Sequence, residues 1–451
     1  MMLLPDTARG RLEVPVLVLV AVAAGGAAGM VSATDAWLGA AVIGSLLLIA
    51  LTAHRPVVLA VIAMIAVFAS QRLGSTALAA GGKPGVTYSD ALLAAAAVLS
   101  IPALLGTEEL RRMRLAGWGI AAYLSFLLPT VLLNSSQRGY LEWLHRLLLL
   151  GGSLLVGAWI ARENKVRPAL RWLTLITCVI AAVAASNAIM HGWTDAVPFG
   201  LNKNFAGGLL GAVIVLVFIA REELALPAPC WYAVIGIISA GEIASHSRGG
   251  ALAASVGLFL AFVLQGRAHR GSARVLAVLV AAGLVVFIYT SVRDQLNHPL
   301  TTRVNHSSIA FRFNVERATR DVWRTSPVYG VGLKYYNAHV YGPYGVAADN
   351  AVDNELAESG IIGLAGFVIL QGAMLSAGFR RGRREPLAAA GFGVVAGLLA
   401  HGMVDIYWTA GTVTLPFIIM GIGLAREPSD HIHRPARRGS SVDPPRVEMG
   451  T

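Results

Sequence analysis

Long apolar stretches recur along the chain from Val14 to Leu424 and are separated by short polar segments. They show no strict alternation of apolar and polar residues, which indicates helices rather than the strands of a membrane barrel. A helix needs roughly 20 mostly apolar residues to cross the hydrocarbon core of a bilayer. The pattern therefore predicts an all-α, polytopic transmembrane bundle of about 12–14 spans. The expected spans begin near Val14, Ala36, Val57, Tyr88, Ala116, Leu141, Ala169, Phe205, Cys230, Gly250, Ala273, Ala357, Leu387 and Thr409.

The composition excludes an ordinary soluble domain. Hydrophobic residues make up 56% of the 451-residue chain and charged residues only 14%, whereas a soluble domain carries about 25% charged residues. The two cysteines, Cys178 and Cys230, provide no disulfide framework.

Clusters of basic residues occur in every second loop, which gives each loop a side of the membrane. The clusters comprise Arg111, Arg112 and Arg114; Arg162, Lys165, Arg167 and Arg171; Arg221; Arg267, Arg270 and Arg274; Arg380, Arg381, Arg383 and Arg384; and Arg426, Arg434, Arg437 and Arg438. These loops and both termini are predicted to be cytoplasmic, the N-terminus because of Arg9 and Arg11. The net charge of +11 thus reflects topology and does not indicate nucleic-acid binding.

Four parts of the chain follow from this pattern. Residues 1–290 hold transmembrane helices with short loops, and 292–356 form one large outward loop domain with an amphipathic helix. Residues 357–425 hold the C-terminal transmembrane helices. Residues 426–451 are rich in Pro, Arg and Ser and are predicted to be a disordered cytoplasmic tail.

Two short polar motifs lie at outward ends of spans. Asn202-Lys203-Asn204 is a compact set of hydrogen-bond donors, and Asn204 is also a candidate helix N-cap; the two roles can coexist. Arg248, in Ser245–Gly250, is costly at a membrane boundary unless it is paired or faces a wet cavity. Its guanidinium suits phosphate, although snorkelling to the interface is an alternative. Arg146 is the clearest membrane-embedded charge and lies close to the same face.

The long segment from Val292 to Leu356 is rich in positive charge, which suggests an anionic substrate. Within it, Ile309 to Arg324 is predicted to form an amphipathic helix. One face carries Arg312, Glu316 and Arg320, and the apolar face carries Phe311, Val315, Ala318 and Val322. The alternative is an interfacial helix whose arginines meet lipid headgroups, which applies more to Arg317 and Arg324 than to Arg312.

The last outward segment, Asp349 to Gly360, carries several carboxylates at the entrance of a span. Asp349 and Asp353 are four residues apart, as are Asn350 and Asn354, so each pair shares a helix face. A carboxylate here could act as general base towards a hydroxyl. Capping of the span is the alternative, and it is expected to account for Glu355 and Glu358.

Taken in order, these motifs resemble the O-antigen ligase and polymerase family of bacterial membrane proteins. The resemblance covers roughly Val197 to Ala425 and rests on four motifs. The first two are Asn202-Lys203-Asn204 and Ser247-Arg248-Gly249. The third is Arg312 upstream of Pro327 and Gly330-Val331-Gly332, and the fourth is Asn350 followed by Glu358-Ser359-Gly360-Ile361-Ile362-Gly363-Leu364.

The resemblance implies an all-helical bundle in the bacterial inner membrane with a large periplasmic loop between late spans. It implies a metal-independent glycosyltransferase without cofactors, whose donor is a glycan on undecaprenyl diphosphate. Arg248 and Arg312 are then the expected diphosphate ligands. Substrate contacts are expected from Asn202, Lys203, Asn204, Arg146, Arg320, His339, Asn350 and Asp353.

One departure bears on the acceptor. Where related ligases carry His-Asn, this chain has Asp349-Asn350, so the base is expected to be Asp349 or a nearby group such as His339. This favours a polysaccharide polymerase, with an O-antigen ligase acting on lipid A core or another acceptor as the alternative. A lipid-linked sugar flippase is less favoured, because the outward motifs show no internal repeat. The expected partners are the lipid-linked oligosaccharide, an acceptor glycan or glycolipid, membrane lipids and, as a candidate, a chain-length regulator.

Overall fold

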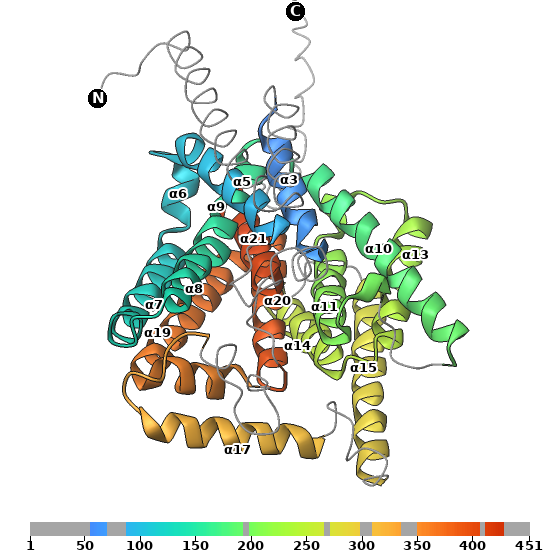
Figure 1. Cartoon of the computed structure of the whole chain (residues 1–451). Coiled ribbons are helices and arrows are strands. Elements are labelled where there is room, and N and C mark those ends of the chain that lie inside the picture. Colours follow the sequence, from blue (N-terminus) through green and yellow to red (C-terminus); the bar gives the residue numbers. More distant parts are fainter. Residues whose placement is uncertain are drawn as a thin grey trace, which may run out of the picture.

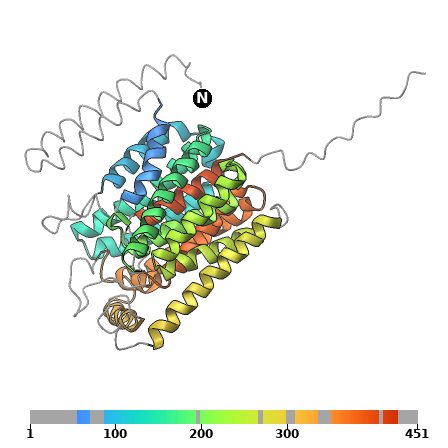
Figure 2. The same ribbon diagram turned by 90° about the vertical axis from the view of Figure 1, so that its right-hand side faces the viewer.

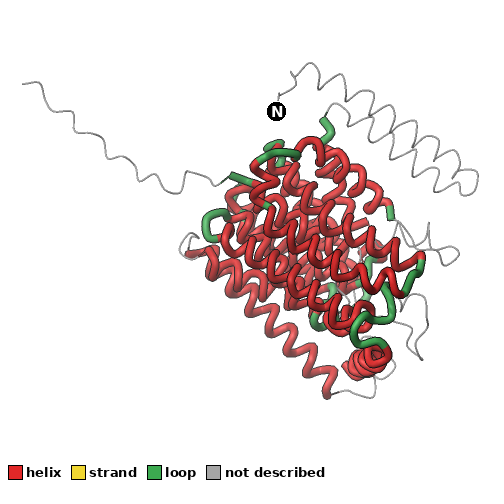
Figure 3. Tube along the Cα trace, turned by 90° about the vertical axis from the view of Figure 1, so that its left-hand side faces the viewer, coloured by secondary structure: helices red, strands yellow, loops and turns green. Residues whose placement is uncertain are grey.

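The computed structural model describes residues 55–69, 87–192, 198–265, 271–297, 309–334, 350–405 and 411–427. Every regular element in these ranges is helical, as the sequence predicts (Figure 3). The predicted spans beginning at Val14 and Ala36, and nearly all of the C-terminal tail, lie outside the described residues.

Each span predicted from Val57 onwards coincides with a described helix. The elements are α3 (Val57–Ala66), η1 (Val67–Ala69), α5 (Tyr88–Leu104), α6 (Glu108–Arg112), α7 (Arg114–Leu133), α8 (Gln137–Leu147), η2 (Leu148–Gly152), α9 (Ser153–Arg162), α10 (Val166–Met190), η3 (Pro198–Gly200), α11 (Lys203–Ile219), α12 (Arg221–Leu224), α13 (Ala228–Ala244), α14 (Arg248–Gln265), α15 (Gly271–Asn297), α17 (Ile309–Thr325), α19 (Ala351–Gly382), α20 (Pro386–Gly402) and α21 (Gly411–Ala425).

Within the described ranges, 5 helical stretches are long and apolar enough to cross a membrane. They are Arg114–Leu133, Gln137–Arg162, Val166–Met190, Arg248–Gln265 and Ala351–Gly382. The outer surface of the bundle carries large apolar side chains such as Trp172, Phe259 and Val278, which are more than half exposed. Exposing such an apolar surface to water is unfavourable, whereas contact with lipid is not.

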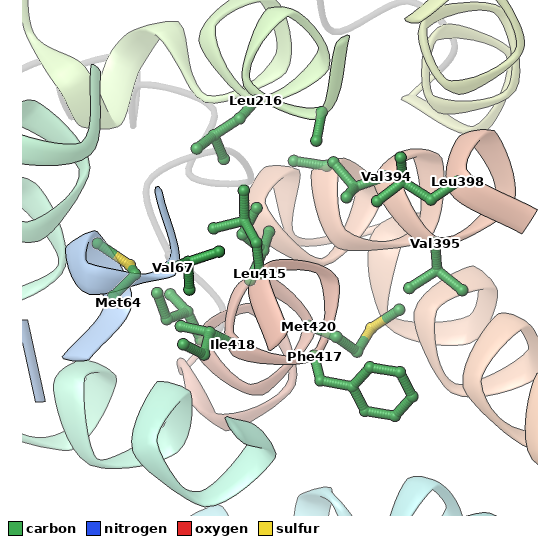
Figure 4. Close-up of a cluster of buried hydrophobic side chains, with 14 of the residues drawn as sticks. Met64, Val67, Leu216, Val394, Val395, Leu398, Leu415, Phe417, Ile418 and Met420 are labelled. Carbon is green, nitrogen blue, oxygen red and sulfur yellow. The ribbon is translucent and has the colours of Figure 1, made fainter. Parts of the chain in front are cut away.

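The core lies where α11, α14, α20 and α21 meet (Figures 1 and 2). Figure 4 shows its apolar side chains, among them Leu216 of α11, Val394 of α20 and Phe417 of α21. Glycines bring the helices together: a Cβ at Gly397 would overlap the carbonyl oxygen of Ala253 on α14. Such close backbone approach is typical of helix packing in membranes.

The basic loops gather at one end of the bundle, as their shared sidedness predicts. Arg426, after α21, forms an ion pair with Glu223 of α12. Arg112 of α6 donates to the carbonyl oxygen of Ala425, and Arg167 of α10 donates to that of Glu223. The ends of α6, α10, α12 and α21 therefore meet on one face.

The opposite end carries α17, which lies across the direction of the bundle helices along the lower edge of Figure 1 and is seen end-on in Figure 2. Val315 and Val322 are buried, and Val322 packs on Ala357 of α19. Arg317 and Arg324 are exposed. The predicted amphipathic helix is therefore present, with the predicted apolar positions Val315 and Val322 facing inward.

Helix α19 is interrupted at Gly360, whose φ of 67° and ψ of −168° are not helical. The turn after α17 fills the interruption: the amide of Val331 donates to Ala357 O at 3.0 Å, and the amide of Ile361 donates to Pro327 O at 3.0 Å. Backbone groups in a membrane protein need such internal partners. The Pro327–Gly332 turn thus stabilises a broken helix.

We expect Gly360→Ala to destabilise the protein by at least about 1–3 kcal/mol, the typical strain of a residue in this backbone region. A Cβ at Gly360 would also overlap the carbonyl oxygen of Val328. Thermal unfolding of the detergent-purified protein, followed by fluorescence-detected size exclusion, measures the change. Gly372→Ala on the same helix is the control, since its Cβ would meet nothing within 4 Å. Equal unfolding temperatures for the two variants would contradict the assigned break.

Candidate functional site

Two groups of polar side chains lie at the end of the bundle that carries α17. The first surrounds the starts of α11 and α14. Asn202 caps α11, because its Oδ1 accepts from the amides of Asn204 at 2.8 Å and Phe205 at 3.4 Å. The prediction that Asn204 is the N-cap is wrong, because α11 begins at Lys203 and its N-cap is Asn202, two residues earlier.

The structure brings the Asn202–Asn204 motif and the Ser245–Gly250 motif together. A Cβ at Gly207, one turn after Lys203, would overlap the side chain of Ser247. The Oγ of Ser247 accepts from the amide of Gly250 at 3.1 Å, which caps α14 just before Arg248. Lys203 and Arg248 therefore begin two helices that pack together. Both side chains are partly buried.

Glu242 and His401, which the sequence analysis did not single out, lie beside the first turn of α14. Glu242 is fully buried, and neither carboxylate oxygen has a hydrogen-bond partner within the described ranges. A Cβ at Gly250 would overlap its Oε1. His401 of α20 packs against Gly249, and its Nε2 lies 3.9 Å from Oδ2 of Asp405. An acid in an otherwise apolar helix is the sequence feature that could have identified Glu242.

The second group centres on Arg146 of α8. Its guanidinium donates to Glu142 at 3.2 Å, Glu355 at 2.7 Å and Glu358 at 3.0 Å, and also to the hydroxyl of Tyr123. All four partners are buried. The prediction that Glu355 and Glu358 cap the span is wrong: Asn350 caps α19 by accepting from the amide of Val352 at 2.8 Å, and the two glutamates lie further along and bind Arg146.

Further ion pairs extend this group across the fold. Lys334, after the Pro327–Gly332 turn, places its Nζ 3.6 Å from Oε1 of Glu142. His145 lies 3.2 Å from Asp90 of α5 and 3.5 Å from Glu142. We call Asp90, Tyr123, Glu142, His145, Arg146, Lys334, Glu355 and Glu358 the Arg146 cluster. It joins α5, α7, α8, α19 and the turn after α17.

Some of the remaining predicted site residues lie within the described part of the chain, and others do not. Nη2 of Arg320 lies 3.4 Å from Oδ2 of Asp353 and thereby ties α17 to α19. Arg312 belongs to α17, eight residues before Arg320. His339 and Asp349 lie outside the described residues. In the part of the chain that the structure describes, no group of three His, Cys, Asp or Glu side chains is arranged to hold a metal ion.

The two groups of side chains at this end of the bundle differ in charge. The starts of α11 and α14 offer cationic side chains, Lys203 and Arg248, which suit a phosphate or diphosphate. The Arg146 cluster instead pairs most of its charges internally and has more carboxylates than cationic side chains. Different parts of the same face therefore offer cations for a negatively charged leaving group and carboxylates that can accept a proton.

Comparison with known proteins gives one family. Residues 233–368 match the model of the O-antigen ligase family, and no curated protein matches the chain. The matched region runs from α13 to the middle of α19 and includes Arg248, Arg312, Asn350 and Glu358. The Asn202–Asn204 motif precedes it. The chain therefore carries a region similar to the O-antigen ligase family, residues 233–368, within an apolar, all-helical bundle.

Proposed function

We propose that the protein is a glycosyltransferase of the bacterial inner membrane. It transfers a glycan from undecaprenyl diphosphate to a sugar hydroxyl of an acceptor on the periplasmic face. The observation that carries the proposal is the position of Arg248, inside the family-matched region and beside the separate motif that contains Lys203. Two cationic motifs meeting at one end of an apolar bundle suit a lipid-anchored diphosphate.

In the proposed reaction, the acceptor oxygen attacks the anomeric carbon while the bond from that carbon to the diphosphate oxygen breaks. The electron pair goes to the diphosphate, where Arg248 and Arg312 neutralise the developing charge. Lys203 adds a third cation. Asn202, Asn204, Arg320, His339, Asn350 and Asp353 remain the proposed contacts to the sugars. Arg146 is bound to three glutamates instead, so its proposed role is to hold those carboxylates. No metal ion or cofactor takes part in this step.

A polysaccharide polymerase is the favoured form of this activity, with a second lipid-linked glycan as the acceptor. It is supported by Asp349, which occupies the position where the resemblance to related ligases leads us to expect a histidine. An O-antigen ligase acting on lipid A core is the second candidate, because the matching family model is described as O-antigen ligase. The two candidates share the donor and differ in the acceptor.

A reconstituted assay tests the proposal. The purified protein is placed in liposomes with undecaprenyl-diphosphate-linked repeat units, either alone or with lipid A core. Products longer than one repeat in the first mixture support the polymerase, and transfer to lipid A core in the second mixture supports the ligase. If neither product forms and the donor remains intact, the proposed glycosyl transfer is wrong.

The arginine alternation predicts the sidedness of the loops. In a background without Cys178 and Cys230, we expect Tyr341→Cys to react with an impermeant maleimide added to the periplasmic side, and Arg383→Cys to remain unlabelled. Arg383 is used because it is exposed, whereas the neighbouring Gly382 packs against Ala389. Disruption of the membrane should expose Arg383→Cys. Labelling of Arg383→Cys, but not Tyr341→Cys, in intact spheroplasts would reverse the topology.

A further inference from the structure

We propose that Glu358 accepts the proton of the attacking hydroxyl, an inference that rests on the proposed glycosyl transfer. The reaction needs a group that removes this proton as the acceptor oxygen bonds to the anomeric carbon. Glu358 lies in the Arg146 cluster, two residues before the interruption of α19 at Gly360. Its suitability follows from its hydrogen bonds, from the charge of the cluster and from its position.

The hydrogen bonds and ion pairs together single out one oxygen of the cluster. Both oxygens of Glu142 are engaged, by Arg146 and Lys334 on one side and by His145 on the other. Both oxygens of Glu355 are engaged too, by Arg146 and Tyr123 and by Ser359.

Asp90 is likewise fully engaged, since its Oδ1 faces His145 and its Oδ2 accepts from Thr87. Glu358 differs: its Oε2 accepts from Arg146 at 3.0 Å, whereas its Oε1 has no hydrogen-bond partner within the described ranges. The Glu358 side chain keeps 4% of its surface exposed, whereas Glu242 is fully buried. Among the four carboxylates of the cluster, Glu358 therefore has the oxygen that can take a proton.

The charges of the cluster favour uptake of one proton. Its acids are Asp90, Glu142, Glu355 and Glu358, and its bases are His145, Arg146 and Lys334. With every acid ionised and His145 protonated between its two carboxylate neighbours, four negative charges face three positive charges. One added proton makes the cluster neutral. Neutrality is favoured where burial weakens solvation of net charge.

The position of Glu358 joins it to the rest of the site. Its backbone carbonyl accepts from the amide of Gly332 at 3.0 Å, so the turn after α17 holds it in place. Helix α20 packs against both α14, which begins with Arg248, and α19. The helices that carry Glu358 and Arg248 thus pack against the same neighbour and also contact each other.

The step balances without a further reactant. The hydroxyl proton moves to Oε1 of Glu358, the oxygen bonds to the anomeric carbon, and the bond to the diphosphate breaks with its electron pair leaving on the diphosphate. Glu358 then returns its proton to water after the product leaves. Arg146 keeps the carboxyl group in place throughout.

The test is the pH dependence of kcat for polymer formation in liposomes. We expect Glu358→Gln to lower kcat by about 100-fold or more and to remove the rise of kcat with pH that the wild type shows. Glu358→Asp, which keeps a carboxylate further from the acceptor, should retain part of kcat and the rise with pH. Glu355→Gln is the matched comparison: it removes one negative charge beside the same arginine and leaves the Glu358 carboxylate in place. The rise of kcat with pH should therefore remain in this variant and move to lower pH.

The outcomes separate the two proposals. A wild-type protein that transfers no glycan overturns the proposed function. A wild type that makes product, together with a Glu358→Gln variant of unchanged kcat and pH profile, overturns only the role of Glu358. If Glu358→Gln does not fold, Glu358→Asp decides: a pH profile displaced from that of the wild type supports the role, and an identical profile contradicts it.

Discussion

Replacing either Arg248 or Arg312 with alanine is expected to abolish detectable polymer formation while the protein still inserts into the membrane. Loss of one preorganised donor to a developing charge typically costs about 100- to 1,000-fold in rate. Arg248 begins α14 beside the motif that contains Lys203, and Arg312 belongs to α17 across the same end of the bundle. The measurement is the rate of chain extension from lipid-linked repeat units, with membrane insertion checked by immunoblot.

Arg317→Ala is the matched control for Arg312→Ala. It removes an arginine from the same helix, but Arg317 is exposed on the surface of α17. Its loss should therefore cost much less than the loss of Arg312. Arg248→Lys adds a second comparison, because it keeps the charge and removes the planar fork that suits phosphate. An essential Arg317 with a dispensable Arg312 would show that the faces of α17 are assigned wrongly.

Asp349→Asn is expected to impair polymer formation by about 100-fold, the cost of misplacing a reacting group by about an ångström. With Glu358 as the proton acceptor, the proposed role of Asp349 is to orient the acceptor sugar. Asp349→His should retain some activity, because the family resemblance implies that imidazole is tolerated at this position. The same extension assay measures both variants.

The KM for the acceptor distinguishes the proposed role from a structural one. A positioning residue should change KM for the acceptor together with kcat, while thermal stability stays close to that of the wild type. Near-normal kinetics of Asp349→Asn would remove Asp349 from the site. His339 and Asp353 would then be the next residues to replace.

Local patterns in the sequence were sufficient to predict the helices, and basic residues from several predicted cytoplasmic loops meet at one end of the described bundle. A run of apolar residues places a span near its observed start, and the arginine clusters meet at one end because the spans alternate in direction. The inward positions of α17, Val315 and Val322, follow from helical periodicity alone. These features depend on residues close together in the chain.

The partners of the buried charges could not be predicted in the same way. Arg146 was recognised as an embedded charge, but Glu355 lies 209 residues later and Glu358 lies 212 residues later. Spacing within α19 says only that they are near one another. The break at Gly360 depends likewise on a turn from another part of the chain, since a glycine by itself does not show whether a helix continues.

The pairing of Glu142 with Arg146 on one helix has a consequence for biogenesis. A single charge at the centre of a span costs about 2.5–3.5 kcal/mol during insertion by the translocon. Glu142 and Arg146 lie four residues apart and pair within the same span at 3.2 Å, so this span can leave the translocon with its opposite charges already matched. Glu355 and Glu358 are synthesised much later and enter the membrane beside an arginine that is already there. We therefore expect α7 and α8, which carry Tyr123 and Arg146, to form the site on which the acidic helix α19 docks as it leaves the translocon.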